Sequence, residues 1–195
     1  MDYFIIYKPF NILSQFTPEK EGQRTLADLY PFPKDVYAVG RLDYDSEGLL
    51  ILTNDKTLNA ALLSPQKKHT REYTVQVEGD ATDAQLQQLA AGVTISINGK
   101  KHQTLPVSAS RIDAPTLPER LPAIRFRAAI PTIWLRLILT EGKNRQVRRM
   151  TAAVGLPTLR LVRTRIENLV LPEDVQSGAV WKMEREELYR LLNIR

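Results

Sequence analysis

Acidic side chains gather in one short segment of the chain. Asp43, Asp45 and Glu47 occupy alternate positions between two glycines, and Arg41 stands two positions before the first of them. β-Rich runs flank the segment at residues 36–39 and 49–53, so its side chains are held at the edge of a rigid element. We interpret residues 40–48 as an active-site loop, which Asp45 and Glu47 are expected to orient through hydrogen bonds to backbone amides. The chemistry that it offers is that of an ionised carboxylate beside a guanidinium.

The same spacing is also typical of the first half of a calcium-binding EF-hand loop. The three acids would supply oxygens at positions one, three and five, and Gly48 would be the turning glycine at position six. The twelfth position, which must supply a bidentate carboxylate, is Asn54, and the apolar run at 49–53 is a strand where a helix should begin. We therefore expect no metal in this loop.

A pair of acids can also divide the acid and nucleophile roles of a glycosidase. On a strand-like segment Asp43 and Asp45 would share a face at about 6–7 Å, which is near the separation found in retaining enzymes. Arg41 lies on that face too and would hold both carboxylates ionised. Neither aspartate would then be a good general acid, which disfavours this chemistry.

Three motifs together resemble one family. Gly-Arg-Leu-Asp at 40–43, followed by Ser-Glu-Gly-Leu-Leu-Ile-Leu-Thr-Asn at 46–54, resembles the central motif of the RNA pseudouridine synthases, in the branch that acts on ribosomal RNA. Lys8-Pro9 resembles the opening strand of that branch. Glu-Gly-Lys-Asn-Arg-Gln-Val-Arg-Arg-Met at 141–150 resembles its basic helix. The motifs stand in the family's order, and the resemblance spans nearly the whole chain.

The resemblance implies an isomerase that needs no cofactor. Such an enzyme breaks the N1–C1′ glycosidic bond of one uridine in ribosomal RNA, here that of the large subunit (23S), turns the uracil and rejoins it through C5. It also implies one catalytic domain over residues 1–195, with two lobes around an active-site cleft. The additional N-terminal RNA-binding module that most of the branch carries is not expected. Nothing in the sequence indicates which uridine is chosen.

Motif position assigns the catalytic residues. The resemblance makes Asp43 the catalytic carboxylate, and Arg148 the partner that keeps it ionised, with Arg149 as the alternative. It places Tyr73 beside the aspartate to stack on the uracil, although a tyrosine on an inner strand face is ordinarily a core residue. Either Leu159 or Leu161 is expected to pack under the base.

Basic residues suggest where RNA would bind. Arg145, Arg148 and Arg149 stand at i, i+3 and i+4, so they would share one helix face, and such self-repulsion usually indicates an anion opposite. A solvated basic face is the alternative. A loop with four prolines between residues 113 and 131 could be an RNA-facing insertion, and His69 on a basic connector could touch phosphate. The residues predicted to contact RNA are Arg41, Lys67, Lys68, Arg71, Lys143, Arg145 and Arg149.

Composition agrees with these expectations and excludes several others. The chain of 195 residues has 27 Lys and Arg against 22 Asp and Glu, a net charge of +5, which suits a polyanionic partner. The absence of cysteine excludes disulfide scaffolds, zinc fingers and thiol catalysis. No run approaches the length of a membrane span. We expect a cytoplasmic protein without metal or membrane contact, and a monomer.

Hydrophobic periodicity and turn signals predict the elements. Strands are expected at 3–7, 72–78, 133–140 and 158–166, and a hairpin of 93–97 with 100–110 around Asn98-Gly99. Helices are expected after a cap at Asn54 or Asp55, at 83–91 behind a Thr82/Gln85 capping box, between a cap at Asn144 and a stop at Gly155, and at 184–192. Without a repeated βαβ unit, the prediction is an α+β fold with a mixed, mostly antiparallel central sheet and flanking helices.

Two classes of function follow, and a third is weaker. An isomerase and a non-catalytic RNA-binding module would both be basic. A pure binder has no use for Asp43 among arginines that face phosphates, which favours the enzyme. A hydrolase would need a positioned water and a general acid, and no candidate for that acid is visible.

Overall fold

The computed structural model describes residues 1–124, 127 and 130–194. Residues 125–126 and 128–129 of the proline-rich loop lie outside the described residues. The helices are α1 (Lys56–Leu63), α2 (Asp83–Ala91), α3 (Gln146–Ala153) and α4 (Arg185–Leu191), with short 3₁₀ turns η1 (Leu26–Asp28) and η2 (Pro65–Lys67). The strands are β1 (Tyr3–Lys8), β2 (Ile12–Leu13), β3 (Arg24–Thr25), β4 (Tyr37–Ala38), β5 (Glu47–Thr53), β6 (Arg71–Glu78), β7 (Thr94–Ile97), β8 (Lys100–Gln103), β9 (Ser108–Ile112), β10 (Thr132–Leu139), β11 (Thr158–Ile166), β12 (Leu169–Val170) and β13 (Val180–Lys182).

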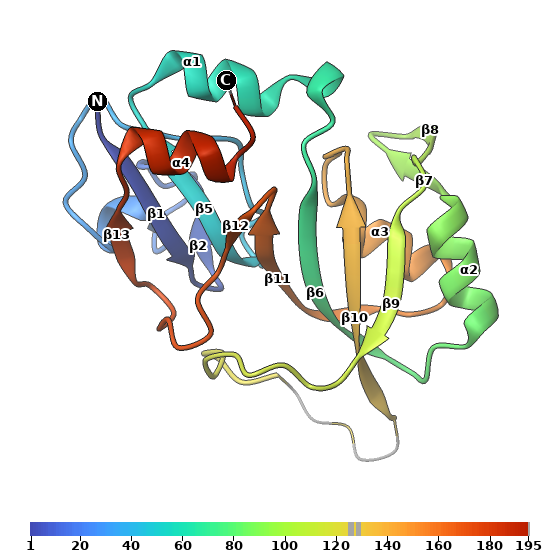
Figure 1. Ribbon diagram of the computed structural model, residues 1–195. Coiled ribbons are helices and arrows are strands. Elements are labelled where there is room, and N and C mark those ends of the chain that lie inside the picture. The colour runs from blue at the N-terminus through green and yellow to red at the C-terminus, as the bar shows by residue number, and fades with distance from the viewer. Residues whose placement is uncertain (125–126, 128–129, 195) are drawn as a thin grey trace.

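One large sheet runs through the molecule (Figure 1). Its strands follow the order β13-β1-β5-β11-β6-β10-β9, with β4 added to β5 and β12 to β11. All pairs of neighbouring strands in this sheet are antiparallel except β5 with β11, which is parallel. The predicted α+β fold with a mixed, mostly antiparallel sheet is therefore confirmed.

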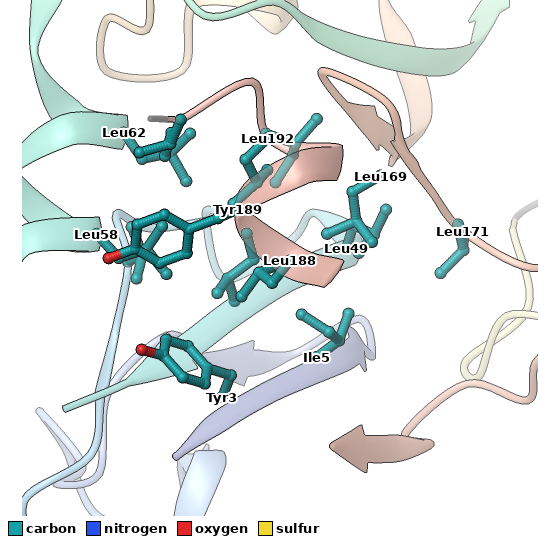
Figure 2. Close-up of a cluster of buried hydrophobic side chains, with 14 of the residues drawn as sticks. Tyr3, Ile5, Leu49, Leu58, Leu62, Leu169, Leu171, Leu188, Tyr189 and Leu192 are labelled. Atoms are coloured by element: carbon teal, nitrogen blue, oxygen red, sulfur yellow. The ribbon is translucent and has the colours of Figure 1, made fainter. Parts of the chain in front are cut away.

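Two lobes lie on either side of β11. The first lobe packs β1 and β5 under α1 and α4, with side chains such as Tyr3, Ile5, Leu49 and Leu188 in its core (Figure 2). The second lobe packs β6, β10, α2 and α3 around a separate core. β11 supplies side chains to both cores, because successive residues of a strand point to opposite faces. No helix in the described part of the chain is long and apolar enough to cross a membrane.

Gly48 makes the parallel junction between the lobes possible. It lies opposite Arg163 in the pairing of β5 with β11 and has a φ of +104°. A Cβ at this position would lie 2.3 Å from the Arg163 carbonyl oxygen and 2.7 Å from its nitrogen. Only glycine fits this approach and this backbone conformation.

Capping residues mark the starts of two helices as predicted. Thr82 and Gln85 form the capping box of α2, and the Asp55 side chain caps α1. The other oxygen of Asp55 accepts hydrogen bonds from Tyr3 at 2.8 Å and from Tyr189 at 2.6 Å, which ties β1 and α4 to the start of α1. Both tyrosine rings point toward this helix in Figure 2.

The predicted hairpin was wrong in its second half. β7 and β8 pair around Asn98-Gly99 only as far as Gln103, and residues 108–112 form β9 at the edge of the large sheet. Pro106 lies between the two segments and cannot donate to a strand ladder.

The described part of the proline-rich loop returns to the first lobe. It leaves β9 and runs below the sheet toward β12 and β13 in Figure 1. Leu117 packs against the first core, and the Arg120 guanidinium lies 4.2 Å from the Phe10 ring centre. Leu117 and Arg120 thus pack against the first lobe, whereas Leu121 is exposed.

Candidate active site

A cleft of about 580 Å³ opens between the two lobes. The first lobe contributes the acidic loop and the end of α1, and the second contributes the start of β6, the end of β10 and the segment that leads into α3. β11 also contributes to the wall. The lining residues that bear functional groups include Arg41, Asp43, Arg71, Tyr73, Glu141, Lys143, Arg145 and Arg163.

Asp43 faces this cleft beside Arg145, and not beside Arg148 as predicted. The Arg145 Nη1 lies 3.9 Å from the Asp43 Oδ2, while the same guanidinium donates to both oxygens of Asp45 at 2.7 and 2.8 Å. Arg148 contacts Asp45 instead, with its Nε 3.3 Å from Oδ2 and its Nη2 donating to the Asp45 carbonyl. The predicted pairing of Asp43 with Arg148 is therefore corrected to Arg145.

Backbone conformation explains this correction. Arg145 precedes the first turn of α3 in a left-handed conformation, with φ of 50°, so it is not one helical residue among three on a common face. Arg149, the predicted alternative, donates from Nη2 to the Asn144 Oδ1 at 3.0 Å. The Asp45 carboxylate binds two of the three arginines, Arg145 and Arg148, so the anion that these two face belongs to the protein itself.

The three acids of the loop have different surroundings. Burial raises the pKa of Asp45, but the hydrogen bond from Arg145 and the charge of Arg148 outweigh it and hold that pKa below its usual value. Glu47 is buried in a bidentate pair with Arg160, at 2.9 and 2.8 Å. The side chains of both acids thus bind arginines, where the sequence suggested backbone amides. Among the described residues, Asp43 is the one acid of this loop that lines the cleft.

Tyr73 and Leu161 give the cleft a flat, apolar wall. Tyr73 is half-buried on β6, and Leu161 lies on β11, the neighbouring strand. The sequence left open whether Leu159 or Leu161 would reach the site. Leu161 lines the cleft, whereas Leu159 lines a separate hollow of about 110 Å³.

The predicted RNA-binding residues fall into two groups. The first group lines the cleft and consists of Arg41, Arg71, Lys143 and Arg145. Arg41 and Lys143 are exposed, and the Arg71 guanidinium donates to the His69 and Leu62 carbonyls. The residues of the second group lie outside the lining, and they are Lys67 and Lys68, exposed around η2, and Arg149 on α3.

Two buried cations of the site were not identified from the sequence. Lys8 is fully buried and donates to the carbonyls of Pro9, Ile12 and Tyr44, the last within the acidic loop. Burial lowers the pKa of Lys8 to about 7. Arg163, on β11, lines the cleft. Strand alternation from Leu161 was the only signal that could have indicated Arg163.

Neither histidine serves the site directly. His69 is buried with its Nδ1 3.3 Å from Glu167, so the prediction that it touches phosphate is not supported, and His102 lies 3.1 Å from Glu141. Within the described ranges no three His, Cys, Asp or Glu side chains group as metal ligands would.

Residues 2–153 match the RNA pseudouridylate synthase family. The chain belongs to this family. Among RNA pseudouridylate synthases it is 53% identical over 178 residues to ribosomal large subunit pseudouridine synthase E of Vibrio vulnificus (strain CMCP6), covering 91% of this chain and 73% of that protein. The protein of the same name from Xanthomonas campestris pv. campestris is 50% identical over 167 residues, covering 83% and 85%.

More distant family members share the fold. Ribosomal large subunit pseudouridine synthase B of Bacillus subtilis is 30% identical over 190 residues, covering 97% of this chain and 70% of that protein. A crystal structure of a pseudouridylate synthase superposes with a TM-score of 0.77 at 24% identity, covering 97% of this chain and 73% of the other. The predicted family is therefore confirmed.

Proposed function

We propose that the protein converts a uridine of large-subunit ribosomal RNA to pseudouridine. One observation carries this proposal: Asp43, Arg145 and Tyr73 line a single cleft in a member of the RNA pseudouridylate synthase family. The names of its most similar relatives support the large-subunit RNA as the substrate.

In this proposal Asp43 is the catalytic carboxylate. It would act on the target nucleotide, with the Arg145 guanidinium 3.9 Å from its Oδ2. Asp45 and Arg148 serve indirectly, because they fix the Arg145 guanidinium beside Asp43. The two parallel hydrogen bonds of the Arg145–Asp45 pair fix the orientation of the Arg145 guanidinium.

Tyr73 and Leu161 would receive the uracil. An enzyme that acts on a base inside a folded RNA takes it out of the stack at a cost of a few kcal/mol, and the extracted ring must be met by flat or apolar groups. Tyr73 offers a stacking surface, and Leu161 offers an apolar floor on the adjacent strand.

Exposed cations around the cleft would hold the flanking RNA. Arg41 and Lys143 lie at the lining, with Arg71 deeper, and would meet the phosphates or the vacated stack. Lys67, Lys68 and Arg149 would extend this contact along the RNA.

The reaction is an isomerisation, so it needs no net oxidant, reductant or cofactor. We propose that the protein acts as a monomer in the cytoplasm.

Tritium release from unmodified large-subunit RNA tests the proposal. The RNA is transcribed with [5-³H]UTP, because rejoining through C5 expels the hydrogen at that position. The native protein should release tritium, and Asp43→Asn should not, while both bind the RNA with similar affinity. Small-subunit RNA labelled in the same way is the matched substrate control.

Binding without release by the native protein would contradict the isomerase and favour an RNA-binding module. Equal release from both RNAs would contradict the choice of the large subunit. Retained activity in Asp43→Asn would remove Asp43 from its role.

A further inference from the structure

Arg163 is a buried cation, and none of the residue roles proposed above involves it. Its side chain is 5% exposed and lines the cleft. The Nε donates to the Leu49 carbonyl at 2.8 Å, and the Nη2 is buried without a hydrogen-bond acceptor among the described residues. Within the same residues no carboxylate lies at ion-pair distance from it. Two other arginines of β11 are paired, Arg160 with Glu47 and Arg165 with Glu72.

Burial without a counter-charge is costly for a guanidinium. A charge removed from water is normally compensated by an ion pair and by hydrogen bonds to all of its donors. Arginine cannot escape this cost by losing its proton. A ligand that brings an acceptor to the free nitrogens would supply the missing compensation.

The position of Arg163 indicates which part of a nucleotide it would meet. It lies directly opposite Tyr73 in the pairing of β6 with β11, so the two side chains are neighbours on one face of the sheet. A uracil stacked against Tyr73 therefore presents its edge to this guanidinium. The phosphates belong at the exposed side of the cleft, where Arg41 and Lys143 lie.

The surroundings of Arg163 favour negative charge. Burial lowers the pKa of Arg71 and also that of Lys8, and repulsion from Arg163 acts in the same direction on both. Arg71 and Arg163 thus lie near each other in the lining of the cleft, and Lys8 is fully buried outside that lining. An anionic group formed there would be stabilised without any reorganisation of the protein.

We propose that Arg163 is a catalytic residue that donates hydrogen bonds to a uracil carbonyl oxygen and stabilises the negative charge of the detached base. This inference rests on the proposed function. When the N1–C1′ bond breaks, its electron pair stays with the uracil, and the charge is shared with O2 and O4. It disappears when C5 bonds to C1′, C5 loses its proton and N1 gains one. Arg163 keeps all of its protons throughout.

Single-turnover tritium release with Arg163→Gln and Arg163→Lys tests this role. Arg165→Gln is the matched control, because it makes the same change two residues along β11 at a side chain outside the cleft lining. RNA affinity is measured by filter binding, and folding by urea denaturation. For Arg163→Gln we expect a rate about 10²–10³-fold lower, the usual loss for one donor to a developing anion. RNA affinity should stay within about threefold of native, because the interaction forms mainly after bond cleavage.

The lysine and control variants make the test specific. Arg163→Lys keeps the charge but not the planar fork, so it should recover part of the lost rate. Arg165→Gln should react within about threefold of native. A purely structural role would lower rate, affinity and stability together.

A folded Arg163→Gln protein with a near-native rate would overturn the inference, as would equal losses in affinity and rate. If Arg163→Gln does not fold, the lysine variant decides: a rate at least about tenfold lower at native affinity supports the role, and a native rate overturns it. If even the native protein releases no tritium, the proposed function fails and the inference falls with it.

Discussion

Gly48 is the residue at which the smallest substitution should do the most damage. We expect Gly48→Ala to lower the free energy of unfolding by about 3 kcal/mol or more, because the added Cβ would meet the Arg163 backbone at a positive φ. Gly99→Ala is the matched control, since Gly99 also has a positive φ but has no atom within 4 Å of its Cβ position. It should cost about 1–2 kcal/mol. Urea denaturation measures both, and equal losses would show that the junction tolerates a side chain.

Lys8 should make stability depend on pH. Its folded pKa of about 7 lies below the ordinary 10.5, so between these values the unfolded chain binds a proton that the folded protein does not. The free energy of unfolding should therefore rise from pH 7 toward 10.5, by at most about 1.4 kcal/mol per pH unit, and this gain is lost as the pH falls back to 7.

Denaturation midpoints of the native protein and of Lys8→Met between pH 7 and 10 test this prediction. The Lys8→Met protein should show a flatter slope. Lys182→Met, which changes an exposed lysine, should keep the native slope. Parallel slopes for all three proteins would mean that Lys8 does not titrate in this range.

Residue patterns identified the acidic loop and Tyr73 because these depend on local motifs. The same patterns assigned the wrong arginine to Asp43. Helical spacing assumes that Arg145 is a helical residue, and it cannot predict the left-handed backbone conformation that Arg145 adopts. The pairing of Arg160 with Glu47 and the contribution of Arg163 to the cleft were missed for another reason. Their contacts with β5 join residues 113 and 114 positions apart, and no local pattern encodes such a pairing.

At the scale of elements, the 3₁₀ turn η2 and the residue after it should act as an RNA contact. Lys67 and Lys68 are exposed there, between α1 and β6. We expect the double variant Lys67→Glu, Lys68→Glu to weaken RNA binding and to reduce the salt slope by roughly one unit for each phosphate that is no longer bound.

Binding at several salt concentrations measures this effect. Lys182→Glu, which reverses a charge on β13 at one edge of the sheet, should leave the slope unchanged. An unchanged slope in the double variant would remove the turn from the RNA interface.

The starts of α1 and α2 were the most predictable feature of the elements, whereas the predicted Asn144 cap of α3 was wrong because Arg145 is its N-cap. The capping box of α2 and the cap of α1 depend on side chains within three residues, so the sequence contains the whole signal. The sequence did not predict that β9 would be separate from the hairpin. β9 pairs with β10, which follows the proline-rich loop, and this pairing depends on tertiary packing.

For the whole molecule, the shared strand β11 predicts cooperative unfolding. The chain has two tryptophans, Trp134 on β10 in the second lobe and Trp181 on β13 in the first. In the single-tryptophan variants Trp134→Phe and Trp181→Phe, each remaining fluorophore reports one lobe. After correction for the stability of each variant by circular dichroism, the fluorescence and circular dichroism midpoints should coincide. A lobe that unfolds at a lower urea concentration would contradict this expectation.

The overall class was predictable, since strand and helix signals without βαβ repeats indicate an α+β fold. The resemblance added the two lobes. Neither indicated that one strand would complete both cores, because the order of strands in a sheet is decided by packing between distant segments.

The late position of β11 has a consequence for synthesis on the ribosome. Arg160 is made 113 residues after its partner Glu47, which at about 5–20 residues per second is roughly 6–20 s later. Until then the start of β5, at Glu47 and Gly48, lacks its β11 partner, and we expect this unpaired segment to be open to pairing with other chains. Asp43 is among the first parts of the cleft to be translated, yet its surroundings are completed only when the last third of the chain has emerged.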